Sequence, residues 1–242
     1  MIPAKAYGMI KKKSNPQPKE IVMSFKTELH CHCKEISLCA DVNVDIVAKK
    51  YLDAGYSTIV LTNHFNYDTI RNRDYKDYSD FLDQYIGAAE KLQNRVGDQI
   101  KILLGMEIRF SNNWNDYLVY GVTPEFLREN LNILDMPLNS FHELVNQYGM
   151  LLFQAHPFRF GMTTTNPQNL DGIESHNGHP HHNSNNDIAE AWAEKYKLLR
   201  SAGSDYHHER DNPTSGIITE HPILNQEDLL SVLRSGNFEI IR

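Results

Sequence analysis

Glu28-Leu29-His30-Cys31-His32 ends a run of residues that has the length and composition of a buried strand. Residues two apart on a strand face the same side, so the imidazoles of His30 and His32 are predicted to point together. Cys31 then points to the other side, which argues against a zinc site that mixes these imidazoles with neighbouring thiols. A His-x-His pair by itself is a weak signal, because it also fits two ordinary polar residues at a strand end or a structural zinc site.

Four further apolar runs along the chain end in the same kind of side chain. They end in Thr62-Asn63-His64, Gly105-Met106-Glu107, Ala155-His156-Pro157 and Gly203-Ser204-Asp205-Tyr206-His207. A barrel of parallel strands brings its strand ends to one rim, where side chains from several strands can meet. Burying the carboxylate of Glu107 behind an apolar run is unfavourable unless it is paired or bound to metal. Together the five clusters predict a multinuclear metal site.

Seven strand-like runs alternate with helical patterns, which predicts one α/β domain. The strands are expected at 25–32, 57–64, 100–108, 117–122, 150–156, 172–176 and 197–204, and the helices at 44–52, 81–92, 124–132, 138–148, 187–196 and 226–234. Such alternation implies parallel pairing with right-handed crossovers, and seven units favour a barrel over an open sheet. The barrel domain is assigned to 25–242, after a polar N-terminal extension at 1–24 that contains Pro16 and Pro18.

The composition excludes some classes of function. With a net charge of −7, the chain has no general attraction for nucleic acid or for an anionic membrane. No apolar run reaches the length of a membrane span, and no secretory signal is apparent. The cysteines crowd into residues 31–39 and suggest no disulfide framework, so a reducing cytoplasm is the expected compartment.

The order and spacing of the five clusters resemble those of the PHP (polymerase and histidinol phosphatase) family from about residue 25 to 210. The resemblance implies a distorted seven-stranded (β/α)7 TIM-like barrel and two or three divalent cations: Zn²⁺, Mn²⁺ or Fe²⁺. It also implies hydrolysis of a phosphate ester by metal-activated hydroxide. By motif, His30, His32, Glu107 and Asp205 would hold the first cation, Glu107 and His156 the second, and His64 and His207 the third.

Three positions depart from the family pattern. Asn63 stands where family members often carry an aspartate, and the fourth strand, 117–122, has no histidine at its end. The remaining ligand of the third cation is open, with Glu35 the best candidate, followed by Cys39 and Asp41. His207 or His64 is expected to protonate the leaving alkoxide if it is not fully committed as a ligand.

Arginine side chains close to the clusters are candidates for binding the substrate. Arg109 and Arg159 can point towards the same rim, and arginine binds phosphate through two parallel hydrogen bonds. The alternative is that each arginine pairs with a nearby acid. Asn177 is expected to bind substrate or a metal-bound water, whereas Glu174 is expected to be a structural anchor. The loop histidines around 176–182 are predicted to be solvent-facing or rim residues, with His182 the leading exception, and His142, His208 and His221 are given no role.

The sequence favours a small phosphomonoester, a nucleotide or a nucleic-acid end as substrate, because no basic stripe is present to track a long strand. An amidohydrolase that cleaves C–N bonds is a rival hypothesis, since that class also begins with His-x-His on a barrel strand. Glu107 would then replace the carbamylated lysine that bridges the cations of that class. A third hypothesis is a catalytically weak barrel that binds metal or ligand, which the missing fourth-strand histidine keeps open. No membrane partner is expected.

Overall fold

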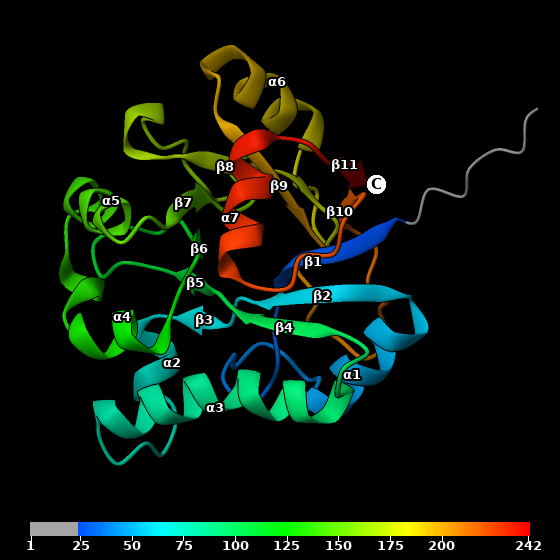
Figure 1. Ribbon diagram of the computed structural model, residues 1–242. Coiled ribbons are helices and arrows are strands. Elements are labelled where there is room, and N and C mark those ends of the chain that lie inside the picture. Colours follow the sequence, from blue (N-terminus) through cyan, green and yellow to red (C-terminus); the bar gives the residue numbers. More distant parts are fainter. Residues whose placement is uncertain (1–23) are drawn as a thin grey trace, which may run out of the picture.

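The computed structural model describes residues 24–242, which form an α/β fold of two sheets with helices packed around them (Figure 1). The predicted α/β class is confirmed. Nearly all of the extension predicted at 1–24 lies outside the described residues. Within 24–242, every helix is too short or too polar to cross a membrane.

The first sheet contains both parallel and antiparallel pairs. Its order is β11 (Glu239–Ile241), β10 (Gly216–Thr219), β1 (Phe25–Cys31), β2 (Tyr56–Leu61) and β4 (Lys101–Leu104). β1, β2 and β4 pair in parallel, as predicted for the first three strands. β10 and β11 add antiparallel pairs beside β1 and were not predicted.

The second sheet continues from the ends of two strands of the first. Its order is β3 (His64–Phe65), β5 (Met106–Ile108), β6 (Tyr117–Tyr120), β7 (Leu151–Gln154), β8 (Gly172–Asn177) and β9 (Leu199–Gly203). β6 is antiparallel to both β5 and β7, while the other pairs are parallel. Residues 109–116 between β5 and β6 are too few for the crossover helix that a parallel pair needs, so the chain turns back.

The predicted seven strands are therefore not the strands observed, because the described residues contain eleven strands in two sheets. The predicted strands 57–64 and 100–108 are each interrupted, the second at Gly105. A Cβ at Gly105 would lie 2.7 Å from Val60 Cγ1 and 2.8 Å from Thr62 Cγ2, so these two side chains leave no room for one. Hydrogen bonds still cross the interruption, from Gly105 N to Leu61 O at 2.9 Å and from Glu107 N to Asn63 O at 3.1 Å.

The helices occupy the predicted regions, with one short addition. They are α1 (Val44–Asp53), α2 (Tyr67–Arg71), α3 (Tyr78–Val96), α4 (Pro124–Glu129), α5 (Leu138–Gln147), α6 (Asn186–Tyr196) and α7 (Gln226–Ser235), of which α2 was not predicted. In Figure 1, α1 and α3 lie along one side of the molecule near β2 and β4, and α6 lies at the opposite side beside β8. Asn43 caps α1 by accepting a hydrogen bond from Ile46 N–H at 2.9 Å.

Two clusters of apolar side chains form the core. The smaller one joins strands of both sheets, for example Leu29 of β1 and Leu118 of β6, and is closed by Leu229 and Leu233 of α7. The larger one fills the space between the strands and the other helices. Cys31 belongs to this larger cluster, so its thiol points away from the imidazoles that flank it in sequence.

The two sheets also meet where β1 lies beside the end of β9. Cys31 and Tyr206 form a parallel bridge, and His32 N–H donates to Tyr206 O at 3.2 Å. A Cβ at Gly203 would lie 2.3 Å from the Cβ of His30, so only glycine permits this approach. The contact places His30 and Asp205 side by side.

Candidate metal centre

The side chains of His30, His32, Glu107 and Asp205 converge on one buried point. His30 Nε2 lies 3.3 Å from Glu107 Oε1 and 3.4 Å from Asp205 Oδ1. His32 Nε2 lies 3.4 Å from Glu107 Oε2 and 3.5 Å from Asp205 Oδ1. The structure thus brings together the four residues that the sequence assigned to a first cation position.

Several polar atoms at this point have no hydrogen-bond partner among the described residues and are suitable ligands for a cation. Within residues 24–242, His30 Nε2, His32 Nε2 and Glu107 Oε2 are buried without a hydrogen-bond partner. An unsatisfied buried polar atom is destabilising, and each such atom in a native fold calls for an explanation. Two imidazole nitrogens and two carboxylates are suitable donors for Zn²⁺, Mn²⁺ or Fe²⁺. The donor set therefore fits a divalent cation.

The other nitrogen of each imidazole is held by a neighbour. His30 Nδ1–H donates to Glu174 Oε1 at 2.8 Å, and His32 Nδ1 lies 3.0 Å from Ser37 Oγ. The Ser37 hydroxyl donates to Asn63 Oδ1 at 3.0 Å, so it accepts from the His32 ring. Both rings are thereby oriented with Nε2 towards the centre. An amide oxygen at position 63 serves this purpose, although the family often has aspartate there.

A second cation position adjoins the first at Glu107 and His156. His156 Nε2 lies 3.1 Å from Glu107 Oε1 and 4.0 Å from Asp116 Oδ2. Asp116 was not predicted, because a parallel strand at 117–122 would bring its last residue, not the residue before it, to the site. β6 runs antiparallel to its neighbours, so the residue before it reaches the site. The short link 109–116 was the signal that could have found Asp116.

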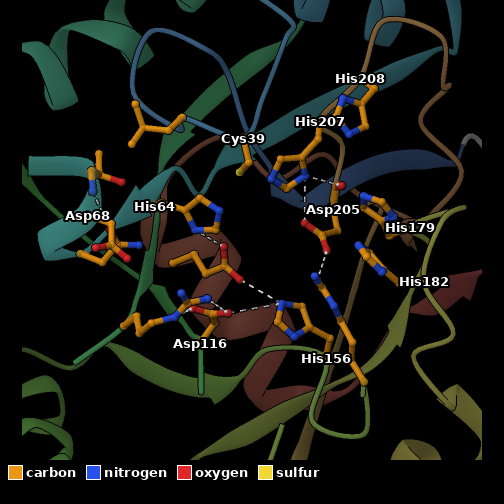
Figure 2. Close-up of a pocket in the computed structure, with 16 residues that line it drawn as sticks. Cys39, His64, Asp68, Asp116, His156, His179, His182, Asp205, His207 and His208 are labelled. Carbon is orange, nitrogen blue, oxygen red and sulfur yellow. Dashed lines mark hydrogen bonds and ion pairs between the residues drawn. The ribbon is translucent and has the colours of Figure 1, made fainter. Parts of the chain in front are cut away.

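A third cation position lies between His64 and His207. The ring centroid of His32 is 4.5 Å from that of His64 and 4.1 Å from that of His207. His64 Nδ1 is 2.7 Å from Glu107 Oε2, which ties this position to the other two. The thiol of Cys39 lies beside His64 and His207 in the same cavity (Figure 2).

The two other candidates for this position are engaged elsewhere. Glu35, preferred on sequence, accepts a hydrogen bond from Val44 N–H at 3.1 Å at the start of α1. Asp41 accepts from Glu209 N–H at 2.9 Å and lies 3.1 Å from His208 Nδ1 on the surface. The structure therefore replaces Glu35 with Cys39 as the residue next to His64 and His207.

Backbone strain is concentrated at two of these residues. His156 has φ 28° and Asp205 has φ 49°, both in the left-handed region that non-glycine residues rarely adopt. Strained backbone persists where the surrounding structure holds it, and it clusters at functional sites. Here it aims an imidazole and a carboxylate into the centre.

Buried opposite charges control ionisation at the centre. Burial alone would raise the pKa of Asp205, but His30 and His207 beside it hold that pKa well below its usual value. Burial alone would lower the pKa of His207, but Asp205 raises it to about 10. Burial together with the positive charges of His207 and His64 lowers the pKa of His32. Burial would raise the pKa of Cys39, yet hydrogen bonds with His207 and His64 lower it to about 6. These shifts favour carboxylates and imidazolium ions around a neutral His32.

The two arginines differ in what they contact. Arg109 makes two hydrogen bonds to Asp116, at 2.8 and 2.7 Å, so it is paired with an acid. Arg159 lies in the wall of the cavity, with Nη1 3.7 Å from Asp205 Oδ2. Asn177 Nδ2 donates to Glu174 at 3.0 Å and to Asp205 at 3.2 Å, so it orients both carboxylates.

The cavity over these positions has a volume of about 340 Å³. His179 and His182 line it opposite His64 (Figure 2), and His179 lies within ligand distance of Asp205 and His207. The prediction for the loop histidines thus singled out His182 but missed His179. His181 instead pairs with Asp211 at 3.1 Å. The volume is that of a small-molecule site.

Comparison with known proteins agrees with this arrangement. Residues 28–208 match the PHP domain. Comparison with curated proteins gives no match. Similar solved structures include a two-domain protein from Bacteroides vulgatus described as containing a predicted PHP-like metal-dependent phosphoesterase. It has a TM-score of 0.64 and 17% identity, with 96% of this chain and 69% of that chain covered.

Two further solved structures have lower TM-scores. The lesion-specific endonuclease Q from Pyrococcus furiosus has a TM-score of 0.61 and 16% identity, covering 90% of this chain and 58% of that chain. An amidohydrolase from Chromobacterium violaceum, with bound sulfate and no metal, has a TM-score of 0.51 and 15% identity, covering 90% and 98%. At these identities the likeness concerns the fold.

Proposed function

Because this chain belongs to the PHP domain family, we propose that it is a metal-dependent hydrolase that cleaves phosphate esters. The observation that carries the proposal is the set of buried atoms aimed at one point. His30 Nε2, His32 Nε2 and Glu107 Oε2 have no hydrogen-bond partner in the described chain, and the Asp205 carboxylate lies within 3.5 Å of both rings. A bound cation supplies the missing interactions.

Each cation position has its own set of residues. His30, His32, Glu107 and Asp205 would hold the first cation, Glu107, His156 and Asp116 the second, and His64 and His207 the third. Divalent cations bound there lower the pKa of water to near neutrality and neutralise charge on phosphoryl oxygens. Arg109 acts indirectly, because its two hydrogen bonds fix the Asp116 carboxylate beside His156.

In this proposal Arg159 and two of the histidines also act on the substrate. The Arg159 guanidinium binds phosphoryl oxygens, since it is charged, lines the cavity and has only a 3.7 Å contact with Asp205. His207 and His64 can give a proton to the leaving oxygen when they are not bound to a cation. The cavity of about 340 Å³ and the net charge of −7 favour a small phosphomonoester or a nucleotide over a long nucleic acid.

The two sheets support one further structural proposal, that residues 25–242 act as a single distorted TIM-like barrel. Hydrogen bonds such as that from Gly105 N to Leu61 O cross the interruption in strands 57–64 and 100–108. The bridge between Cys31 and Tyr206 links β1 to the end of β9. A ring closed in this way would bring the ligands of all three positions to one rim.

The test is an aryl-phosphate assay combined with metal analysis. Protein stripped with a chelator is reloaded with Zn²⁺, Mn²⁺ or Fe²⁺, and phosphate release and bound metal are measured together. We expect His32→Ala and Asp205→Ala to abolish activity and to lower metal content. His181→Ala, a histidine paired with Asp211 outside the cavity wall, is the matched control and should change neither. Binding of two or more equivalents with no phosphate release under any metal would contradict the proposal.

The similarity to a named amidohydrolase keeps C–N hydrolysis as the second candidate. Within the described residues, however, no lysine lines the cavity that could take the role of a carbamylated lysine. Glu107 already lies between the positions where that lysine would bridge. The same reloaded protein can be offered amides and lactams, and their cleavage in place of the aryl phosphate would favour this candidate.

A further inference from the structure

We propose that Cys39 is a thiolate ligand of the third cation position, and that this position therefore prefers Zn²⁺, Fe²⁺ or Co²⁺ over Mn²⁺ and Mg²⁺. The inference deepens the proposed function and rests on it, because it concerns the metal chemistry of the same centre. Nothing in the choice between phosphate and amide substrates depends on it.

The geometry of the third position carries the argument. Cys39 lies on the loop between β1 and α1, and its sulfur points to the space between the rings of His64 and His207 (Figure 2). The ring of His32, which is fully buried, faces the same two rings at 4.5 and 4.1 Å. Its Nε2 points to the first position, so the third position is left to His64 and His207. Two imidazoles and one sulfur therefore face this position.

The thiol is available to bind a cation, in contrast to the other two in the chain. Cys39 is exposed, whereas Cys31 and Cys33 are fully buried. Cys33 Sγ accepts a hydrogen bond from Asn63 Nδ2 at 3.3 Å, and both buried thiols belong to the apolar cluster beneath the strands. Only Cys39 lies in the cavity wall.

The ligand types predict the selectivity. Thiolate and imidazole together suit Zn²⁺, Fe²⁺ and Co²⁺, whereas Mn²⁺ and Mg²⁺ prefer carboxylate, carbonyl and water oxygens. The first two positions share the carboxylate of Glu107, and the first also has Asp205. Of the three positions in the described part of the chain, only the third also has a sulfur beside it, so its cation can differ in kind from the other two.

Cobalt substitution tests the proposal directly, because Co²⁺ bound to a thiolate gives a near-ultraviolet charge-transfer band that nitrogen and oxygen ligands do not give. The metal-free full chain is titrated with Co²⁺ while absorbance, bound metal and aryl-phosphate hydrolysis are followed. We expect the band in the wild type and its loss in Cys39→Ser. The matched control is Cys33→Ser, which also removes one thiol and should retain the band. One equivalent of Zn²⁺ should bind at least about 10-fold more weakly to Cys39→Ser. Cys39→Asp should shift that equivalent towards Mn²⁺.

Alkylation gives a second measurement that needs no variant. Iodoacetamide should modify Cys39 in the metal-free protein, and Zn²⁺ should protect it. If the cobalt protein hydrolyses aryl phosphate but lacks the band, or if the band survives in Cys39→Ser, the thiolate proposal is wrong and the proposed function stands. Equal alkylation with and without Zn²⁺ would overturn it as well. If no cation binds to the wild type, both proposals fail.

Discussion

The hydrogen bond between Glu174 and His30 allows a sharp test of how the first cation position is built. We predict that Glu174→Gln weakens binding there by about 10- to 100-fold, the usual effect of removing the partner of a metal-binding histidine. That range corresponds to roughly 1.4 to 2.7 kcal/mol. The full effect is expected because both residues are buried and the bond is short, 2.8 Å.

The geometry explains why the amide cannot substitute for the carboxylate. Glu174 Oε1 faces His30 Nδ1, while Oε2 accepts from His156 N–H at 2.9 Å and from Asn177 Nδ2 at 3.0 Å. A glutamine has one acceptor oxygen and one NH₂ group in these two places. In one orientation its NH₂ faces the His30 Nδ1–H, and in the other it faces the two donors. Either orientation leaves donors opposed, and the first forces the proton of His30 onto the nitrogen that should bind metal.

The assay is competition for Zn²⁺ against a chromogenic chelator, with thermal unfolding as a check on folding. Glu190→Gln is the matched control. Glu190 lies on α6, outside the cavity wall, and pairs with Arg200 of β9 at 3.3 Å. We expect no change in affinity for the control. If Glu174→Gln binds Zn²⁺ within twofold of the wild type, the ring of His30 does not depend on this carboxylate and the reasoning is refuted.

Three other predictions concern the contact of β1 with β9, the binding of the substrate phosphate by Arg159, and the pH dependence of metal affinity. Gly203→Ala places a Cβ 2.3 Å from that of His30, so the free energy of unfolding in urea should fall by about 1–3 kcal/mol, and an unchanged value would contradict the close approach. Arg159→Ala should lower kcat/KM for an aryl phosphate by about 10- to 100-fold, the value of a hydrogen bond to a charged group, with metal content unchanged. If Arg159→Ala loses metal instead, Arg159 supports the metal centre and does not bind the phosphate. In the metal-free protein, Asp205 raises the pKa of His207 to about 10, against the effect of burial, and a cation requires the neutral ring. Burial would lower the pKa of His64, but Glu107 raises it, so His64 must lose a proton as well and affinity at the third position should rise by up to about 100-fold per pH unit between about pH 7 and 9. Calorimetric Zn²⁺ titrations over that range measure the slope, and a pH-independent affinity would show that no proton is displaced.

The assignment of His30, His32, Glu107, His156 and Asp205 to one place could be made from the sequence because it depends on local rules. Side chains two apart on a strand share a side, and buried carboxylates and imidazoles need partners. Those rules use only neighbouring residues and the length of an apolar run. The structure brings these residues together, and their role as metal ligands remains the proposal that the binding assays test.

The strand count could not be obtained in the same way. An apolar run of the right length predicts a strand, but the interruption at Gly105 lies where the side chain of Val60, a residue of another strand, packs against the backbone. The antiparallel direction of β6 was in principle accessible, since the link 109–116 is too short for a crossover helix. The reversed direction brings the residue before β6, Asp116, to the site, and a parallel strand does not predict this.

The sequence by itself determined the class of fold, the family and most of the side chains that meet at the centre, because each follows from the order of residues along single strands. Only the tertiary structure decided which of Glu35, Cys39 and Asp41 lies beside His64 and His207. Lys34 N–H donates to Val42 O at 2.7 Å and Asp41 N–H to His207 O at 3.0 Å, and these bonds bend the loop after β1. The bend turns Glu35 towards the start of α1 and Cys39 towards His64 and His207. Side chains on a strand are placed by its regular geometry, whereas those on a loop are placed by contacts with distant residues.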